Sequence, residues 1–379
     1  MDFSLSKTEI LFRKMIREFA EKEVKPLAAE IDEEERFPLE TVEKMARLGI
    51  MGIPFPAEYG GAGGNNILYT MAVEELSRVC ATTGVIVSAH TSLCAAPIYE
   101  FGTEEQRKKY LPKLCSGEWI GAFGLTEPNA GTDASAQQTM AVLEGDHYVL
   151  NGTKIFITNA AYANVYIVMA MTDKSLGTKG ISAFIVERDF PGFSIGKKEK
   201  KMGIRGSATC ELIFENCIVP KENLLGKPGG GFGIAMKTLD GGRIGIASQA
   251  LGIAQGAMDE TVKYVKERKQ FGKSIGKFQN TQFQLADLET KIQAARLLVR
   301  MAAYKKDQKQ SYSVDAAQAK LFAAETAMEM TTKAVQFHGG YGYTREYPVE
   351  RMMRDAKITE IYEGTSEVQR MVIAGALLK

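Results

Sequence analysis

The apolar residues of this chain follow three successive spacing patterns, and the first is helical. Ile10, Leu11, Met15, Ile16 and Phe19 recur at intervals of three and four residues, which places them on one face of a helix. The same kind of spacing predicts helices at residues 41–45, 71–79 and 104–114, with a glycine-rich break at 59–64. We therefore expect an N-terminal helical domain over residues 1–118.

The second pattern is a period of two, which is typical of strands. Residues 147–150 and 153–158 flank Asn151-Gly152, a dipeptide that favours a two-residue hairpin turn. Further strands are predicted at residues 165–171, 181–186 and 211–214, separated by proline and glycine residues. The middle of the chain, residues 119–228, is predicted to be a small antiparallel β-barrel or sandwich.

The third pattern is helical again and continues to the end of the chain. Residues 244–269, 282–306 and 314–335 form long stretches with apolar stripes and many alanines. Their length predicts a C-terminal four-helix bundle over residues 229–379. The glycine-rich residues 229–233 lack a preceding strand and are interpreted as a linker. The expected fold class is therefore α+β with three domains.

Composition excludes several classes of function. Lys and Arg total 47 against 46 for Asp and Glu, so no global field attracts nucleic acid or an acidic membrane. Five cysteines without a CxxC pair, and no signal or transit segment in Met1-Asp2-Phe3-Ser4, predict a soluble protein of the reducing cytoplasm. No uncharged apolar run is expected to approach the roughly 20 residues needed to span a bilayer. Three histidines and scattered cysteines predict no metal site.

One carboxylate stands out near the end of the chain. Glu363 lies between Tyr362 and Gly364, and a glycine beside a carboxylate lets a substrate approach the backbone closely. The alternative is an ordinary glutamate before a helix that is capped by the following turn. Taken alone, these residues leave both interpretations open.

Four other segments suggest a ligand, each with a structural alternative. Residues 123–133 form a loop that can offer backbone N–H groups to an anionic or carbonyl-rich ligand, or serve only as a domain entrance. Phe156 and Thr158 share a strand face and can wall a flat ring, or belong to the core. The glycines at 339, 340 and 342 indicate close backbone approach, with His338 structural. Arg268 can grip a pyrophosphate or lie on the surface. No GxGxxG motif follows a strand, and there is no P-loop.

Together these segments resemble the acyl-CoA dehydrogenase family along the whole chain. GLTEPNAGTDASA at residues 124–136 is similar to the first signature of that family, and QFHGGYGYTREYPVERMMRD at 336–355 is similar to the second. The closing IYEGT at 361–365 and TLDGGRIG at 238–245 look closest to short-chain, butyryl-CoA dehydrogenase-like members.

The resemblance implies an FAD enzyme that forms a homotetramer, built as a dimer of dimers. It assigns the flavin ring to residues 123–132, including Phe123, Leu125, Thr126, Gly131 and Thr132, and to Phe156, Ile157 and Thr158. It assigns the pyrophosphate and adenosine end, partly across a subunit interface, to Arg268, Phe271, Gln279, Gln336, Phe337, His338, Gly339 and Gly340. Thr365, Ser366 and Glu367 complete the cofactor site. The acyl-CoA contacts implied are Thr132, Asp240, Gly241, Gly242, Arg243 and Gly364.

The resemblance also implies the reaction, which converts butyryl-CoA to crotonyl-CoA. Glu363 removes the α-proton, the β-hydride passes to flavin N5, and the Glu363 N–H with a ribityl hydroxyl polarises the thioester carbonyl. Some relatives place the base just before the arginine that matches Arg243, but Gly242 stands there in this chain. Family members often carry tryptophan at the position of Phe156, so a tuned flavin environment is expected.

The same resemblance implies electron-transferring flavoprotein as the redox partner. The alternative is an oxygen-reducing, acyl-CoA oxidase-like flavoenzyme, although those relatives are usually longer. A nucleic-acid-binding relative is disfavoured by the net charge of +1 and by the presence of Glu363.

Overall fold

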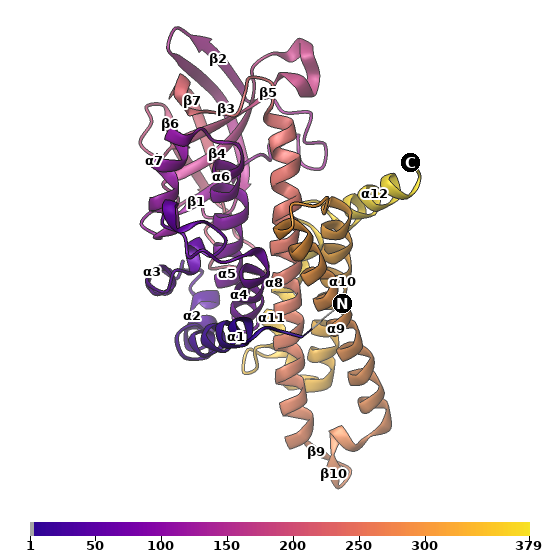
Figure 1. Cartoon of the computed structure of the whole chain (residues 1–379). Coiled ribbons are helices and arrows are strands. Elements are labelled where there is room, and N and C mark those ends of the chain that lie inside the picture. Colours follow the sequence, from indigo (N-terminus) through magenta and orange to yellow (C-terminus); the bar gives the residue numbers. More distant parts are fainter. Residues whose placement is uncertain (1–3) are drawn as a thin grey trace.

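The computed structural model describes residues 4–379 and contains three domains (Figure 1). Residues 1–3 of the N-terminal segment lie outside the described residues, so the expectation about a leader is not tested. The helical first domain, the sheet of the middle and the helical last domain confirm the predicted fold class. The proposed boundaries fall between the last N-terminal helix and the first strand, and between the last strand of the sheet and the first long C-terminal helix.

The first helices of the N-terminal domain pack around one apolar core, whereas residues 94–115 belong to a second core that is shared with the sheet. Ile16 and Phe19 from the first helix are buried in the first of these cores, whereas Ile10, Leu11 and Met15 of the same stripe are exposed. Ser6 and Glu9 form a capping box that starts this helix. The helices of the domain are α1 (Lys7–Phe19), α2 (Ala28–Glu33), α3 (Leu39–Arg47), α4 (Asn66–Ser77), α5 (Ala81–Ser88), α6 (Ala96–Phe101) and α7 (Glu104–Cys115), with a π-helical turn at Ala89–Ala95.

The segment Ala81–Phe101 corrects one expectation from the sequence. Its 21 residues form a continuous helical stretch that is long and apolar enough to cross a membrane. However, 94% of its apolar window is buried inside the protein, which is the property of a core helix. This helix lies against the C-terminal domain and supplies one wall of the cavity described below.

The middle domain is one sheet of eight strands. Its order is β6-β7-β3-β2-β4-β5-β8, with β1 paired to β4 in parallel, so the sheet is mainly antiparallel but not wholly so. The strands are β1 (Gly121–Gly124), β2 (Met140–Glu144), β3 (His147–Ile157), β4 (Val165–Met171), β5 (Ile181–Glu187), β6 (Phe193–Lys198), β7 (Cys210–Pro220) and β8 (Leu224–Leu225).

The predicted hairpin turn at Asn151-Gly152 is wrong. Strand β3 runs through both residues, and the β2–β3 register pairs Glu144 with His147, so the turn is Gly145-Asp146. Gly152 lies at a bulge opposite β7, and a Cβ added there would come within 2.7 Å of the Thr139 Cα. The glycine therefore permits close backbone approach instead of a turn.

The C-terminal domain is a helical bundle built around one long helix. Helix α8 (Gly231–Glu267) has 37 residues and lies along the other two domains in Figure 1. It begins inside the predicted glycine linker. Gly231, its first residue, lies so close to the backbone of Ser182 and Ala183 on β5 that there is no room for a side chain. The other helices are α9 (Gln279–Asp307), α10 (Ser313–His338), α11 (Val349–Lys357) and α12 (Ser366–Leu377), with a small hairpin of β9 (Lys269–Gln270) and β10 (Lys273–Ser274).

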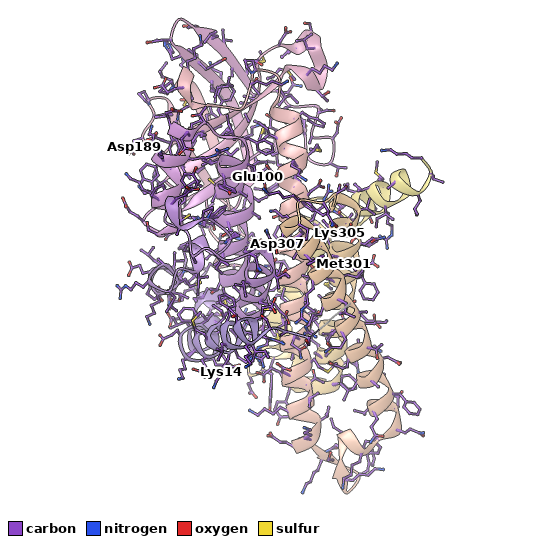
Figure 2. The ribbon with its side chains drawn as sticks, in the orientation of Figure 1. Lys14, Glu100, Asp189, Met301, Lys305 and Asp307 are labelled. Atoms are coloured by element: carbon purple, nitrogen blue, oxygen red, sulfur yellow. The ribbon has the colours of Figure 1, made fainter. Side chains whose placement is uncertain are left out.

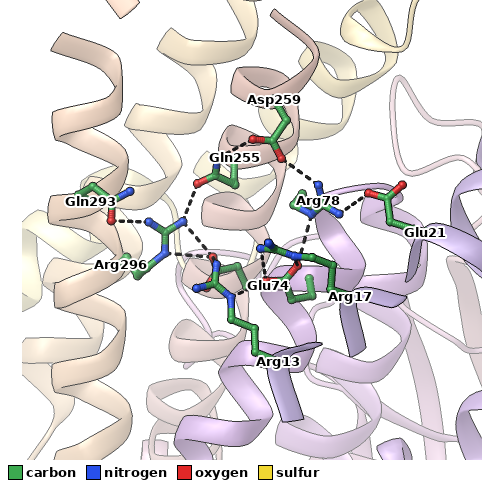
Figure 3. A network of polar contacts seen from close by, with 10 residues as sticks. Arg13, Arg17, Glu21, Glu74, Arg78, Gln255, Asp259, Gln293 and Arg296 are labelled. Atoms are coloured by element: carbon green, nitrogen blue, oxygen red, sulfur yellow. Dashed lines mark hydrogen bonds and ion pairs between the residues drawn. The ribbon is translucent and has the colours of Figure 1, made fainter. Parts of the chain in front are cut away.

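Buried charges fasten the first domain to the bundle (Figure 3). Glu74 on α4 accepts two hydrogen bonds from Arg296 on α9, at 3.1 and 3.0 Å. Arg78 bridges Asp259 on α8 at 2.8 Å to Glu21 near α1. Asp307, which is labelled in Figure 2 at the end of α9, also accepts a hydrogen bond from the Asn66 N–H at 2.8 Å. These contacts fix the helices that surround the cavity.

Candidate active site

A cavity of about 290 Å³ lies where the three domains meet, and it collects most of the residues predicted for the flavin ring and the acyl group. Helices α5 and α8, the loop after β1, the end of β3 and the segment before α12 all contribute walls. The predicted residues on its lining are Phe123, Leu125, Thr126, Gly131, Thr132, Phe156, Ile157, Thr158, Arg243, Glu363 and Gly364. Val85, Ala89, Leu93, Phe232, Met236, Leu239, Tyr362 and Val368 add apolar surface.

The backbone at Glu363 has an unusual conformation. Glu363 has φ +53° and Gly364 has φ +92°, so two consecutive residues adopt positive φ and only the second is a glycine. The Gly364 carbonyl accepts from Lys320 Nζ on α10 and from Gln369 Nε2 on α12, both at 2.8 Å. Strained backbone of this kind persists only where the surroundings hold it, and these two donors do so.

The segment that follows Glu363 begins a helix. The Thr365 side chain accepts the Val368 N–H and caps α12. Ser366 is buried, its Oγ has no hydrogen-bond partner in the described part of the chain, and Glu367 is exposed. None of the three predicted cofactor residues here lines the cavity, although they lie directly beside Glu363.

The Glu363 carboxyl group faces the cavity without a hydrogen-bond partner. Its Oε2 is shielded from solvent and makes no hydrogen bond within residues 4–379. Burial raises the pKa of Glu363 to about 8, although the positive charges of Lys320 and Arg243 oppose the shift. A carboxyl group with such a pKa is suited to accept a proton near neutral pH.

Gly242 makes room for that carboxyl group. A Cβ built at residue 242 would lie 2.0 Å from Glu363 Oε2 and 2.8 Å from Leu93 Cδ2. Any larger residue would therefore displace the carboxylate. The position of the Glu363 carboxyl group therefore requires a glycine at residue 242.

Arg243 is a buried cation on α8 at the cavity wall. Its Nη1 donates to Asp240 Oδ1 at 2.7 Å, and Asp240 also accepts from Ser313 Oγ at 2.9 Å. Gly241 does not line the cavity, since it faces Lys306 Nζ on the other side of the helix. Of the four predicted residues 240–243, only Arg243 lines the cavity, and Asp240 orients it.

The loop that carries Thr126 and Thr132 is anchored by a buried lysine that sequence reasoning missed. Lys154 is fully buried and donates to Leu125 O at 3.1 Å, Glu127 Oε1 at 2.7 Å and Gln137 Oε1 at 2.8 Å. Glu127 in turn accepts the N–H groups of residues 138 and 139. The Glu127 in the first signature motif was the available signal, because a carboxylate buried in a glycine-rich loop needs a partner.

Phe156 is a large aromatic side chain that remains 60% exposed. A bulge between Lys154 and Ile157 gives Phe156 a φ of +59° and interrupts the alternation of strand side chains. Phe156, Ile157 and Thr158 therefore all line the cavity, and simple alternation was the wrong reason for grouping them. Phe156 and Thr158 also line a neighbouring apolar cavity of about 320 Å³.

The residues predicted for the pyrophosphate and adenosine end of FAD do not line this cavity. A separate cavity of about 520 Å³ is lined by Arg268, Phe337, His338, Gly339 and Gly340, and it shares no lining residue with the first. Its buried His338 Nε2 has no hydrogen-bond partner among residues 4–379, and Cβ atoms added to both glycines would meet nothing of that part of the chain within 4 Å. Gln279 and Gln336 are exposed outside this lining, as is Phe271 at 92% exposure.

Comparison with known proteins follows the same division into three parts. Family models match residues 6–118 as the acyl-CoA dehydrogenase N-terminal domain, 122–217 as its middle domain and 229–378 as its C-terminal domain. A short-chain-specific acyl-CoA dehydrogenase of Clostridium acetobutylicum is 66% identical over 379 residues, covering all of both chains.

Two solved structures match over the full length of both chains. Butyryl-CoA dehydrogenase from Megasphaera elsdenii is 54% identical with a TM-score of 0.98. A chain solved in work on the electron transferring flavoprotein of Acidaminococcus fermentans, and on flavin-based electron bifurcation, is 59% identical with a TM-score of 0.99.

Proposed function

This chain belongs to the acyl-CoA dehydrogenase family, and from that premise we propose that it dehydrogenates short-chain acyl-CoA thioesters such as butyryl-CoA at the α and β carbons. The observation that carries the proposal is the Glu363 carboxyl group, with its raised pKa, facing a small apolar cavity.

FAD is the cofactor of this enzyme class, and the residues present fit it. The exposed ring of Phe156 offers an aromatic wall, and the anchored loop at Thr126 to Thr132 offers hydroxyl and backbone donors. Arg268 and the open backbone at Gly339 suit a charged ligand, and His338 Nε2, which has no partner within residues 4–379, can accept a hydrogen bond from a polar group of it. When bound, FAD supplies the acceptor for the hydride that leaves the β-carbon.

Glu363 performs the proton transfer in this proposal. Its carboxylate removes the α-proton, and its unpaired Oε2 accepts that proton without first breaking a hydrogen bond. The Glu363 N–H donates to no acceptor within residues 4–379 and is free to bind the thioester carbonyl. That contact stabilises the negative charge which develops as the α-proton leaves.

We infer that a second copy of the chain completes the cofactor site. The cavity with Arg268 and His338 is separate from the one with Glu363, so one molecule of FAD is proposed to bind residues of two subunits. Helix α9 carries an exposed apolar face of Leu297, Met301 and Tyr304, of which Met301 is labelled in Figure 2, and α12 extends outward from the bundle in Figure 1. These surfaces support the predicted homotetramer.

Electron-transferring flavoprotein is the proposed redox partner, on the likeness to the chain solved with such a protein. The oxidase alternative predicts rapid reoxidation of the reduced enzyme by oxygen, which stopped-flow mixing with air-saturated buffer measures. Rapid reoxidation by the flavoprotein and slow reoxidation by oxygen supports the dehydrogenase. The cytoplasmic location stays a prediction; all five cysteines are buried free thiols.

The direct test is the Glu363→Gln variant. It should retain FAD and bind acyl-CoA but lose turnover by about 10²–10⁴-fold, since the carboxyl group proposed as the base is removed. Glu329→Gln, an exposed residue of α10, serves as the matched control and should keep the parent rate. Dye-linked rates over acyl-CoA chain lengths, with the flavin absorbance spectrum, provide the measurement. Near-normal turnover by Glu363→Gln would disprove the proposal.

A further inference from the structure

The second fully buried lysine, Lys320 on α10, lies beside the catalytic segment. Lys320 has no exposed surface and sits in an alanine-rich part of the bundle. Burying an ammonium group is costly unless a partner compensates for the lost water. The one hydrogen bond it makes within residues 4–379 is to the Gly364 carbonyl, at 2.8 Å.

That carbonyl belongs to the strained part of the backbone. Gly364 and Glu363 both have positive φ, and Gln369 Nε2 also donates to the Gly364 carbonyl and lies 3.4 Å from the Glu363 carbonyl. Lys320 approaches from α10, whereas Gln369 belongs to the helix that follows. Lys320 thus ties the Gly364 carbonyl to the long helix α10 of the bundle.

Lys320 also differs from the other cation near the base. Arg243 on α8 is paired with Asp240 at 2.7 Å, whereas Lys320 has no carboxylate within 4.0 Å among the described residues. Both charges favour the ionised form of Glu363, and that of Lys320 has the larger effect on its pKa. Burial lowers the pKa of Lys320 to about 8, which Glu363, Glu360 and Glu367 partly oppose.

The two tyrosines that also face Glu363 do not supply a positive charge. Tyr69 on α4 and Tyr362 beside the base are neutral over the relevant range, because burial raises the pKa of each phenol. Tyr362 is held by Gln249 on α8. Lys320 is therefore the unpaired positive charge next to Glu363.

We propose that Lys320 is a positioning residue for the dehydrogenation: it holds the Glu363-Gly364 backbone through the Gly364 carbonyl and keeps a positive charge beside the carboxylate. This inference rests on the proposed function, in which Glu363 must be ionised before it removes a proton. Without the cation, a larger fraction of the enzyme carries a protonated and inactive Glu363 at neutral pH.

The test is the pH profile of kcat/KM for butyryl-CoA, measured on FAD-loaded variants with a dye acceptor from pH 6 to 9.5. Lys320→Met removes the charge at nearly constant volume and should shift the midpoint upward by about one pH unit or more. Its activity should fall about tenfold or more at pH 7 and recover part of that loss at pH 9. Lys333→Met, an exposed lysine on the same helix, should keep the parent profile.

Lys320→Arg keeps a permanent positive charge and is the second variant of the experiment. Its midpoint should stay at or below that of the parent, while kcat falls because the guanidinium cannot reproduce the single contact with Gly364 O. If the methionine variant does not fold, this arginine variant decides: a midpoint above that of the parent would overturn the inference. A Lys320→Met midpoint equal to the parent value would also overturn it.

A failure of the role inferred for Lys320 can be distinguished from a failure of the proposed function. If Glu363→Gln retains turnover, the proposed base is wrong whatever Lys320 does. If Glu363→Gln is inactive and Lys320→Met keeps the parent midpoint, only the role of Lys320 fails.

Discussion

The buried ion pair of Lys154 and Glu127 allows a quantitative test of how the cavity loop is held. Lys154 has no exposed surface, and its Nζ satisfies two side-chain acceptors and the Leu125 carbonyl. Glu127 is nearly fully buried at 4% exposure. Replacing Lys154 by methionine leaves that carboxylate without its countercharge.

The expected cost follows from this burial. Breaking a buried pair by removing one partner destabilises a protein by about 3–5 kcal/mol. With roughly 2.1 cal/mol/K of unfolding entropy per residue, such a loss lowers the Tm of a 379-residue chain by about 4–6 °C if it unfolds as one unit. The loop from Thr126 to Thr132 also loses its anchor, so Lys154→Met should release more FAD on dialysis.

The assay compares four proteins by thermal unfolding and by the ratio of flavin to protein absorbance. Lys174→Met, an exposed lysine of the same domain, is the control and should leave Tm within about 1 °C of the parent. Adding Glu127→Gln to Lys154→Met should recover at least half of the lost Tm, because a neutral pair no longer buries an unpaired charge. Equal Tm and flavin content in Lys154→Met and the parent would refute the reasoning.

Three further outcomes are expected. The kcat/KM for butyryl-CoA should rise with pH with a midpoint near 8, because burial raises the Glu363 pKa to about 8 and the active form is ionised; a flat profile from pH 6 to 9 would contradict this. Gly242→Ala should lower kcat by about 10²-fold with FAD content unchanged, since its Cβ displaces the carboxylate, whereas Gly375→Ala on α12 should be neutral. Arg268→Ala should weaken FAD retention and tetramer stability; unchanged flavin content after dialysis would count against its role.

The domain order and the long helices could be predicted from residue spacing, but the details of the β domain could not. Asn151-Gly152 is a strong local turn signal, yet β3 continues through it because both sides pair with β7, as in Leu150 with Cys217 and Gly152 with Phe214. Pairing partners more than sixty residues away decide the outcome, and no local pattern reports them. The start of α8 at Gly231 was missed for the same reason, since its close contact is with β5.

Some features of the site could likewise be predicted from the sequence, whereas others depend on contacts between distant segments. The neighbours of Glu363 left its role open, and the family resemblance singled it out; the structure explains why a residue as small as Gly242 stands beside it. The grouping of Phe156 with Thr158 held, but through a bulge that alternation does not predict. Spacing alone did not show that Arg268 and His338 line a cavity separate from that of Glu363.

The two buried lysines show most clearly why the sequence alone did not predict the contacts that hold the cavity walls. Lysine in a strand or helix pattern is normally assigned to the surface, because its ammonium group is rarely buried without a partner. Lys154 and Lys320 are both fully buried, and each donates to a backbone carbonyl, that of Leu125 or that of Gly364. Those carbonyls belong to segments on two walls of the same cavity. Each lysine thus holds irregular backbone from an element distant in the sequence, and only the tertiary structure connects it to the wall that it supports.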